Sequence, residues 1–419
     1  MVPRVHVRRP SLDPASAEPV IVLGAGPGGL AVAAALARRG VRALVLERSD
    51  AVGASWRRHY DRLHLHTPRR LSGLPGMAIP RRFGRWVSRD DVVRYLEAYA
   101  ARHHLRVRTG VEVTRVERGP AGWVVRTAGG ETFTARELVV ATGYNHTPVP
   151  PRWPGVDTFT GELLHAADYR NPVPFRGRDV LVVGVGNTGA EIAVDLVEGG
   201  AGRVRLAVRT PPHIVRRSSA GWPAQLTGIL VRRLPVPVVD RIARLLALVE
   251  VPDLGRYGLP RPRTGLYSRV KEGSVPVQDV GLIDAVRAGT VEPVAALDAV
   301  DGPDVLLADG SRLTPDVVIA ATGYLRGLEP IVGHLGVLDA RGLPVAHGPR
   351  TPVGAPGLYF TGYTNPISGM FRELRIDAVR IARAVARRRA RAGGARGARA
   401  GGARVAVGDP AVPVGGRTR

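Results

Sequence analysis

The feature that most constrains this chain is a pattern that occurs twice: an apolar strand, a glycine-rich loop, a helix and a second apolar strand. In the first copy, residues 19–23 (PVIVL) lead into the loop 24–29 (GAGPGG), the Ala- and Leu-rich segment 30–39 and the strand 42–47 (RALVLE). G-x-G-x-x-G between a strand and a helix is the fingerprint of a dinucleotide-binding unit. The pattern therefore predicts a βαβ unit with a dinucleotide pyrophosphate at the start of its helix.

The second copy begins at residues 180–183 (VLVV) and continues through the loop 184–189 (GVGNTG), a helix over 190–197 and the strand 204–208 (VRLAV). A further repeat matches residues 138–144 (LVVATGY) with residues 317–324 (VVIAATGY). Each of these strands ends in Ala-Thr-Gly-Tyr and closes one unit. A lone glycine motif is weak evidence, but two copies in the same context predict an α/β fold with two doubly wound, Rossmann-like domains.

Each glycine of the first loop has a separate physical role. Gly24 allows the tight turn, Gly26 lets the backbone approach a pyrophosphate, and Gly29 lets the helix pack closely on its strand. The corresponding positions of the second loop are Gly184, Gly186 and Gly189.

The residue that ends the second strand differs between the two units. Glu47 has about the spacing expected for a carboxylate that binds the adenosine ribose hydroxyls; the alternative is an exposed charge at a strand end. Arg209 has the corresponding place in the second unit, where a cation favours the 2′-phosphate of NADPH over NADH. Thr210, Arg216 and Arg217 can add donors. In an arginine-rich chain, any single arginine is weaker evidence than Glu47.

Composition excludes several functions. The chain has no cysteine, so electrons cannot pass to a disulfide and no thiolate can bind a metal. The net charge of +24 comes from arginine, because Lys271 is the only lysine among 60 basic residues. Residues 387–419 carry nine arginines against one acidic residue. We expect no nucleic-acid partner and no metal.

The ends of the chain and one internal segment depart from the repeated pattern. Residues 1–17 are predicted to be a flexible leader without the apolar core of a signal peptide. Residues 236–254 are predicted to form an inserted amphipathic helix, and residues 376–388 the last helix before a disordered basic tail at 386–419. With no apolar run long enough to span a bilayer, we expect a cytoplasmic protein without a membrane partner.

Residues 159–170 (FTGELLHAADYR) resemble the fingerprint of flavin-containing monooxygenases, Phe-x-Gly-x-x-x-His-x-x-x-(Phe/Tyr)-Lys, with Arg170 in place of lysine. Tyr169 disfavours the related Baeyer–Villiger enzymes, which carry Trp there. A structural hydrogen bond and a chemical role are equally open for His165. The chain is most similar to the YUCCA branch of indole-pyruvate monooxygenases. The resemblance covers about residues 20–383 and includes segments 45–48 (VLER), 60–66 (YDRLHLH), 256–262 (RYGLPRP) and 275–281 (VPVQDVG).

The resemblance implies a fold and a division of the chain. An FAD-binding domain would comprise residues 18–165 and 325–385, and an NADPH-binding domain with a helical insertion, residues 166–324, would be inserted into it. NADPH would reduce FAD, and the reduced flavin would capture O₂ as a hydroperoxide that oxygenates a small organic substrate. A 2-oxo acid such as indole-3-pyruvate is one candidate substrate. The loop 65–69 (LHTPR) departs from the branch pattern Leu-His-Leu-Pro-Lys, which leaves the substrate open.

The predicted site combines the motifs with the resemblance. Asn187 and Thr188 are expected to hold the nicotinamide, and His66 lies near the position where other family members carry a catalytic Asn. We predict Asn187 and His66 as catalytic residues. The predicted cofactor-binding residues are Gly24, Gly26, Gly28, Gly29, Glu47, Arg48, Trp56, His64, Val113, Ala141, Thr142, Gly143, Gly184, Gly186, Asn187, Thr188, Gly189, Arg209, Thr210, Arg217, Ala321, Thr322, Gly323 and Gly362.

Two other functions fit part of the same sequence. An NADPH-dependent flavin reductase or oxidase would pass electrons to another acceptor without oxygenation, and the same motifs would serve it. A basic binding protein built on a nucleotide fold would contain no flavin. The sequence does not set an oligomeric state.

Overall fold

Two five-stranded sheets, parallel throughout, form the framework of the molecule. The computed structural model describes residues 18–401. The first sheet has the order β22 (Leu358–Phe360), β7 (Leu138–Val140), β1 (Val20–Leu23), β2 (Ala43–Leu46), β3 (Val107–Arg108). The second has the order β16 (Glu292–Ala295), β11 (Arg203–Val208), β10 (Asp179–Val183), β20 (Val317–Ala320), β9 (Glu162–His165).

The two sheets repeat the same local arrangement. The central strand of each, β1 or β10, runs directly into a glycine-rich loop. On one side this strand pairs with the strand that follows its helix, and on the other with the strand that ends in Ala-Thr-Gly. The repeats found in the sequence therefore occupy equivalent places in the two sheets, and the fold is a mixed α/β fold with parallel sheets.

The second sheet lies within the sequence of the first, because the chain returns to the first sheet only at β22. The expected domain boundary at residue 165 would place β9 with the first sheet. Instead β9 pairs in parallel with β20, with His165 opposite Ala320. Pairing between an edge strand and a strand this far along the chain leaves no local signal in the sequence.

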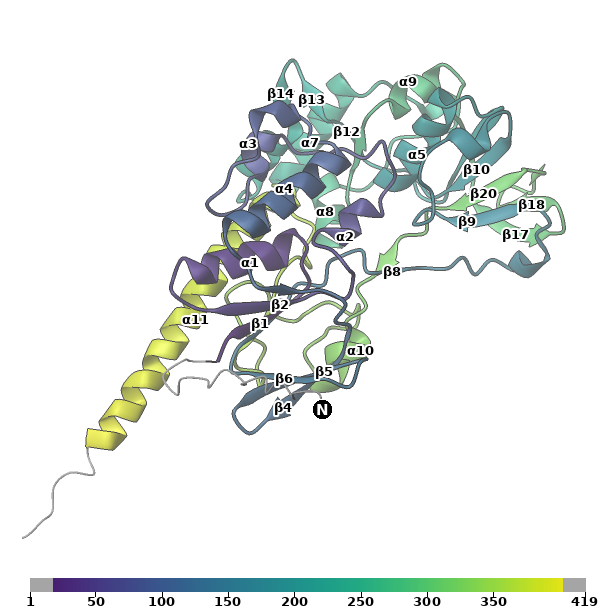
Figure 1. Ribbon diagram of the computed structural model, residues 1–419. Helices are drawn as coiled ribbons and strands as arrows, with labels where there is room; N and C mark the ends of the chain where they lie inside the picture. Colours follow the sequence, from purple (N-terminus) through teal and green to yellow (C-terminus); the bar gives the residue numbers. More distant parts are fainter. Residues whose placement is uncertain (1–17, 402–419) are drawn as a thin grey trace, which may run out of the picture.

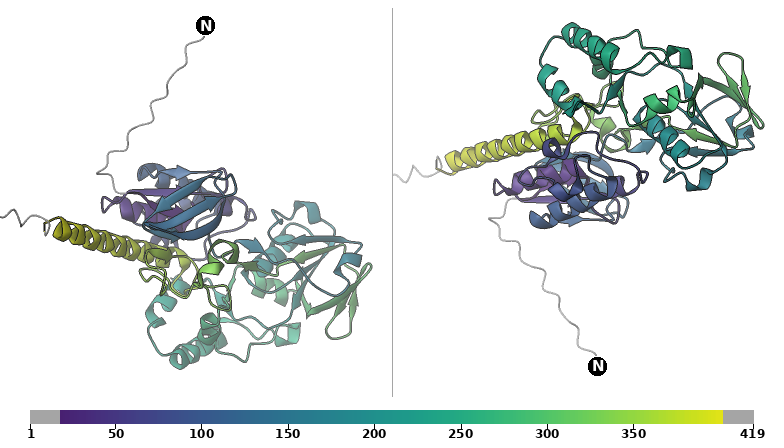
Figure 2. Two further views of the ribbon diagram at one scale, coloured as in Figure 1. Left: turned by 90° about the horizontal axis from the view of Figure 1, so that it is seen from below. Right: turned by 90° about the horizontal axis from the view of Figure 1, so that it is seen from above.

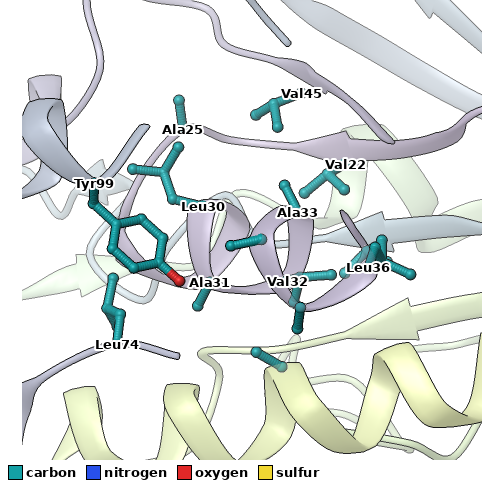
Figure 3. Packing of buried hydrophobic residues seen from close by; sticks show 14 of the residues in the cluster. Val22, Ala25, Leu30, Ala31, Val32, Ala33, Leu36, Val45, Leu74 and Tyr99 are labelled. Carbon is teal, nitrogen blue, oxygen red and sulfur yellow. The ribbon is translucent and has the colours of Figure 1, made fainter. Parts of the chain in front are cut away.

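Helices cover the first sheet on one face. Helix α1 (Pro27–Ala37) packs between the sheet and the long helix α11 (Met370–Gly401), and Figure 3 shows Leu30, Val32 and Leu36 in this layer. Helix α4 (Arg89–Arg102) adds Tyr99 to the same core. The antiparallel strands β4 (Val113–Gly119), β5 (Gly122–Thr127) and β6 (Thr132–Ala135), with α10 (Glu329–Val332), share a second core with the sheet.

The second sheet carries helices α5 (Asn187–Glu198) and α9 (Leu282–Arg287) and a second antiparallel sheet. That sheet is formed by β17 (Leu297–Asp301), β18 (Asp304–Leu307) and β19 (Arg312–Leu313). Figures 1 and 2 show two lobes, with the segment of β8 (Thr147–Pro148) running between them. β8 pairs with β21 (Tyr324–Leu325), so the two crossing segments are joined by a short antiparallel ladder.

The inserted region between β11 and β16 is mainly helical. It contains α6 (Ala224–Val231), α7 (Val236–Glu250) and α8 (Leu266–Lys271), and the short parallel pair β12 (Ile214–Arg216) and β15 (Val277–Asp279). The helix predicted at 236–254 is therefore present but ends four residues earlier, at Glu250. No helix in residues 18–401 is long and apolar enough to cross a membrane.

Helix α11 corrects the prediction of a disordered tail from residue 386. The helix continues to Gly401, because alanine and arginine are strong helix formers. Arg388 and Arg389 also form ion pairs with Glu137, whose side chain is only 2% exposed. The leader 1–17 and the rest of the predicted tail, 402–419, lie outside the described residues.

Candidate functional site

The first glycine loop has a backbone that tolerates no other residue at two positions. Gly24 has φ of +100°, and a Cβ there would lie 2.6 Å from the carbonyl oxygen of Ala141. A Cβ at Gly29 would overlap the carbonyl oxygen of Gly24. A Cβ at Gly26, in contrast, would meet no atom within 4 Å. Gly26 therefore borders open space at the helix start, where a pyrophosphate can approach the backbone.

The second loop repeats this geometry closely. Gly184 has φ of +111°, and its Cβ would lie 2.6 Å from the carbonyl oxygen of Ala321. A Cβ at Gly189 would overlap the carbonyl oxygen of Gly184, and one at Gly186 would meet nothing within 4 Å. Ala141 and Ala321 begin the two Ala-Thr-Gly repeats, so each repeat packs under its own glycine loop.

Both helix starts suit an anion. Helices α1 and α5 begin after Gly26 and Gly186, which provide no side-chain cap, and neither helix has an acidic residue in its first turn. The first backbone N–H groups of a helix lack intrahelical partners and carry the positive end of the helix dipole. The residues present therefore fit two dinucleotide pyrophosphates.

Glu47 is held in place by the first loop. Its Oε2 accepts a hydrogen bond from the Ala25 N–H at 2.7 Å, and its Oε1 accepts one from the Ser49 N–H at 2.9 Å. Each carboxylate oxygen has a second lone pair, so the group can still accept ribose hydroxyls. Glu47 lines the central cavity described below, which fits the role of binding an adenosine ribose.

Arg209 has the corresponding place after β11, and its setting is different. Arg209 and Thr210 are exposed, and no hydrogen bond or ion pair engages the Arg209 side chain within residues 18–392. Arg216 donates to the Glu250 carbonyl oxygen at 2.7 Å. Arg217 stacks on the Trp86 ring at 4.5 Å, and burial lowers its pKa. Of the three arginines predicted here, Arg209 is exposed, whereas Arg216 and Arg217 are half-buried and Arg216 lines the cavity described below.

A cavity of about 1600 Å³ lies between the first loop, the start of α5 and the helical insertion. About half of the predicted site residues line it: Gly24, Gly26, Gly28, Glu47, Arg48, Trp56, His66, Ala141, Thr142, Gly143, Asn187, Thr188 and Gly362. The others lie outside the lining: Gly29, His64, Val113, Gly184, Gly186, Gly189, Arg209, Thr210, Arg217, Ala321, Thr322 and Gly323. The cavity therefore unites the first loop with the beginning of the second helix.

The predicted nicotinamide residue, Asn187, is already engaged by the protein. Its Nδ2 donates to the Pro276 carbonyl oxygen at 3.1 Å, and its Oδ1 accepts from the Gln278 N–H at 2.7 Å. These bonds attach the start of α5 to the segment before and within β15. Asn187 therefore shapes the cavity wall, and Thr188 beside it has the freer side chain.

His66 also lines the cavity, and sequence reasoning missed its partner. Its Nε2 lies 2.8 Å from Oε1 of Glu191, a carboxylate on α5 that is almost fully buried. Burial and Glu191 together raise the pKa of the neighbouring Tyr60 well above its ordinary value. His64, by contrast, turns to the Arg62 carbonyl oxygen at 2.7 Å. A lone glutamate in a helix gives no sequence signal for this contact.

Within the fingerprint segment, Ala167, Asp168 and Arg170 line the cavity, whereas His165 and Tyr169 lie beside it. The Tyr169 hydroxyl donates to Oδ2 of Asp195 at 2.7 Å inside the second core, and burial raises the pKa of Tyr169. His165 accepts from the Ala167 N–H at 3.0 Å and meets the Tyr324 ring edge-on. Burial lowers the pKa of His165. These contacts favour a structural role for His165.

A family model described as pyridine nucleotide-disulphide oxidoreductase matches residues 21–222. Indole-3-pyruvate monooxygenase YUCCA1 of Oryza sativa is 39% identical over 350 residues, covering 82% of this chain and 86% of that protein. Probable indole-3-pyruvate monooxygenase YUCCA9 of Arabidopsis thaliana is 36% identical, with coverage of 87% and 88%. The chain belongs to the flavin monooxygenase family, alongside these YUCCA proteins. It is an oxidoreductase with FAD and NADPH as cofactors.

A solved flavin-containing monooxygenase from Stenotrophomonas maltophilia has the same fold as this monooxygenase. The TM-score is 0.66 at 23% identity, and the match covers 88% of this chain and 99% of that one. The matched family model is named after a disulfide reaction, which a chain without cysteine cannot perform on its own thiols. No group of three or more metal-ligating side chains occurs in the part of the chain that the structure describes.

Proposed function

We propose that the two sheets are two Rossmann-like dinucleotide-binding domains, with FAD in the first and NADPH in the second. The first domain comprises residues 18–161 and 325–385, and the inserted NADPH domain comprises residues 162–324. The boundary moves from residue 165 because β9 pairs with β20. The observation that carries this assignment is the cavity, which joins Gly26 and Glu47 of one unit to Thr188 of the other.

Bound FAD would supply oxygen activation, and NADPH would supply the reducing equivalents. The chain itself binds, orients and excludes water. Gly26 and the α1 N–H groups would hold the FAD pyrophosphate, and Glu47 its adenosine ribose. Asn187 and Thr188 would direct the nicotinamide half toward the first unit. His66, whose Nε2 lies beside the Glu191 carboxylate, would provide a polar group on the wall at the junction.

The coenzyme preference is assigned to Arg209. An exposed guanidinium that has no partner among residues 18–392 can form charge-assisted hydrogen bonds with a 2′-phosphate, and it offers nothing comparable to the 2′-hydroxyl of NADH. Its place at the end of β11 corresponds to that of Glu47 at the end of β2. This correspondence supports NADPH in the second unit.

The substrate we propose is a 2-oxo acid such as indole-3-pyruvate, with O₂ as co-substrate. The YUCCA relatives are named as indole-3-pyruvate monooxygenases. In this chain, the helical insertion contributes both apolar and basic side chains to the cavity wall, among them Leu246, Leu254, Leu259, Arg244 and Arg263. Apolar surface suits an aromatic ring, and a guanidinium suits a carboxylate.

The test supplies indole-3-pyruvate, phenylpyruvate and a simple thioether with NADPH and air, and quantifies acids, sulfoxide and hydrogen peroxide. Indole-3-acetic or phenylacetic acid above the no-enzyme control is the expected result. Sulfoxide without acid would reject the 2-oxo acid and keep the monooxygenase. Peroxide as the only oxygen product with every substrate would favour a reductase or oxidase.

A further inference from the structure

A half-buried histidine lies directly behind the turn that follows β22. Its Nε2 accepts a hydrogen bond from the Gly362 N–H at 3.1 Å, and its Nδ1 lies 3.2 Å from Oδ2 of Asp377. The histidine is His347, in the segment before β22, and Asp377 is on α11. Three segments that are separate in the sequence therefore meet at one imidazole ring.

The contacts fix the protonation of His347. A backbone N–H can only donate, so Nε2 must accept, and the single proton of the neutral ring is on Nδ1, the nitrogen that faces Asp377 Oδ2. Protonation of Nε2 would place two donors against each other at Gly362. Burial and the nearby Arg350 lower the pKa of His347 to about 4, and burial raises that of Asp377 to about 6.

The same cluster reaches the turn after β7. The Tyr363 hydroxyl oxygen accepts from the Thr142 N–H at 3.0 Å and lies 2.8 Å from the Thr142 Oγ1. β7 and β22 are neighbours in the first sheet, so the turns after them lie side by side at its carboxyl edge. Ligands of open parallel sheets bind outside this edge.

Both turns line the cavity and pack beneath the first glycine loop. A Cβ at Gly28 would lie 3.6 Å from Cγ2 of Thr361 and 3.8 Å from Cβ of Ala141. Thr361, Gly362, Ala141 and Gly28 all line the cavity, whereas His347 and Asp377 do not. The His347 and Asp377 side chains can therefore act on a ligand only through these turns.

We propose that His347 and Asp377 are positioning residues for the flavin end of the cavity. Asp377 orients the imidazole, His347 holds the Gly362 N–H, and Tyr363 carries the restraint to Thr142. The group that the turns then hold in place is the flavin dinucleotide. This inference rests on the proposed function, in which the first loop binds FAD.

The experiment measures FAD affinity in flavin-free protein by quenching of FAD fluorescence, so it does not depend on turnover. His347→Leu removes the hydrogen bond from Gly362 and the contact with Asp377. We expect FAD to bind at least about tenfold more weakly, since about 1.4 kcal/mol corresponds to tenfold. His347→Gln provides an amide oxygen to accept and an amide N–H to donate, and should restore most of the affinity. Tyr363→Phe keeps the ring and should weaken FAD binding severalfold.

NADP⁺ affinity and the thermal unfolding midpoint show whether weaker FAD binding comes from the lost positioning contacts or from a general loss of stability. In the Leu and Phe variants, NADP⁺ affinity should stay within about twofold of the wild type, because its loop lies in the other sheet. The control is His334→Leu, which removes a hydrogen bond of 2.9 Å to the Val116 carbonyl oxygen away from the cavity. It should leave FAD affinity unchanged.

Three outcomes overturn the proposal: FAD affinity unchanged in both His347→Leu and Tyr363→Phe, equal losses of FAD and NADP⁺ affinity, or a Gln variant as weak as the Leu variant. Should His347→Leu fail to fold, FAD affinity is compared with NADP⁺ affinity in Tyr363→Phe and His347→Gln instead. Failure of the wild-type protein to bind FAD would instead reject the proposed function itself.

Discussion

The two glycine loops have nearly the same backbone but differ in what surrounds them. The first glycine of each loop has a left-handed φ, and a Cβ there would lie 2.6 Å from the carbonyl oxygen of the alanine that begins the Ala-Thr-Gly repeat. A Cβ on the third glycine would overlap the carbonyl oxygen of the first. Yet Gly24, Gly26 and Gly28 line the large cavity, whereas Gly184 and Gly186 do not. The backbone pattern sets the ability to bind a dinucleotide, and the surroundings set how deeply it is enclosed.

The charged residues that follow β2 and β11 also differ in how far the protein encloses them. Glu47 is immobilised by two backbone N–H groups and lies on the cavity wall, whereas Arg209 is exposed and forms no hydrogen bond or ion pair with the described side chains. A preorganised, enclosed site suits a cofactor that stays bound, and an open site suits a coenzyme that exchanges in each cycle. We interpret the difference as that between a resident FAD and an exchanging NADPH.

The largest expected effect tests the equivalence of the two backbones. Gly29→Ala and Gly189→Ala each place a methyl group inside a backbone carbonyl contact, and we expect each to lower the free energy of unfolding by about 3 kcal/mol or more. Thermal and denaturant unfolding measure it. Gly129→Ala, whose Cβ would meet nothing within 4 Å, is the control. Tolerance of alanine in only one loop would show that the loops are not equivalent.

The next test uses the middle glycines, where a methyl group harms the ligand but not the fold. Gly26 and Gly186 have φ of −79° and −78°, which alanine adopts without strain. Gly26→Ala should bind FAD at least about tenfold more weakly, a loss of about 1.4 kcal/mol, while the protein stays folded. Gly186→Ala should keep its FAD and raise KM for NADPH. Full yellow colour in purified Gly26→Ala protein would contradict the FAD assignment.

A smaller effect concerns the charge of the second unit. Arg209→Ala should raise KM for NADPH about tenfold or more, because a hydrogen bond to a charged group contributes about 1.5–3 kcal/mol. KM for NADH should hardly change. Arg287→Ala, another exposed arginine of the same lobe, is the control for general loss of positive charge. Equal losses with both coenzymes would show that Arg209 does not distinguish them.

The smallest effect is a pH dependence confined to the first unit. The pKa of His347 is lowered to about 4, so its contribution to stability is complete above its ordinary value of 6.5 and is lost as the pH falls toward 4. Asp377, raised to about 6, opposes part of this loss, and Arg350 and Glu373 also face the pair. FAD binding should therefore weaken as the pH falls below 6.5, and its binding free energy should change by less than about 1.4 kcal/mol per pH unit.

His347→Gln, which has no titrating ring, should flatten that curve of FAD binding against pH. NADP⁺ affinity over the same range serves as the internal reference. A variant curve identical to that of the wild type would assign the acid sensitivity to other groups, such as His146, whose pKa is also lowered by burial.

The sequence predicted what depends on local spacing. Both loops, the place of Glu47 and the contrast with Arg209 follow from a strand, a glycine pattern and the next strand. It did not predict contacts made by single polar residues far apart in the chain, such as Glu191 with His66 or Asp377 with His347. Nor did it place Arg217 on the Trp86 ring. Such pairs depend on how whole elements pack, and no periodicity records them.

The late return of the chain to the first sheet has a consequence for biosynthesis. β22 and α11 follow every strand of the second sheet, and α11 covers α1 and pairs with Glu137. During translation, the inserted lobe is complete while the first sheet still lacks an edge strand and its covering helix. Because domains generally fold as units during synthesis, the inserted lobe should fold on the ribosome first. The proposed flavin site, whose lining includes Thr361 and Gly362, is complete only when the last segment has emerged.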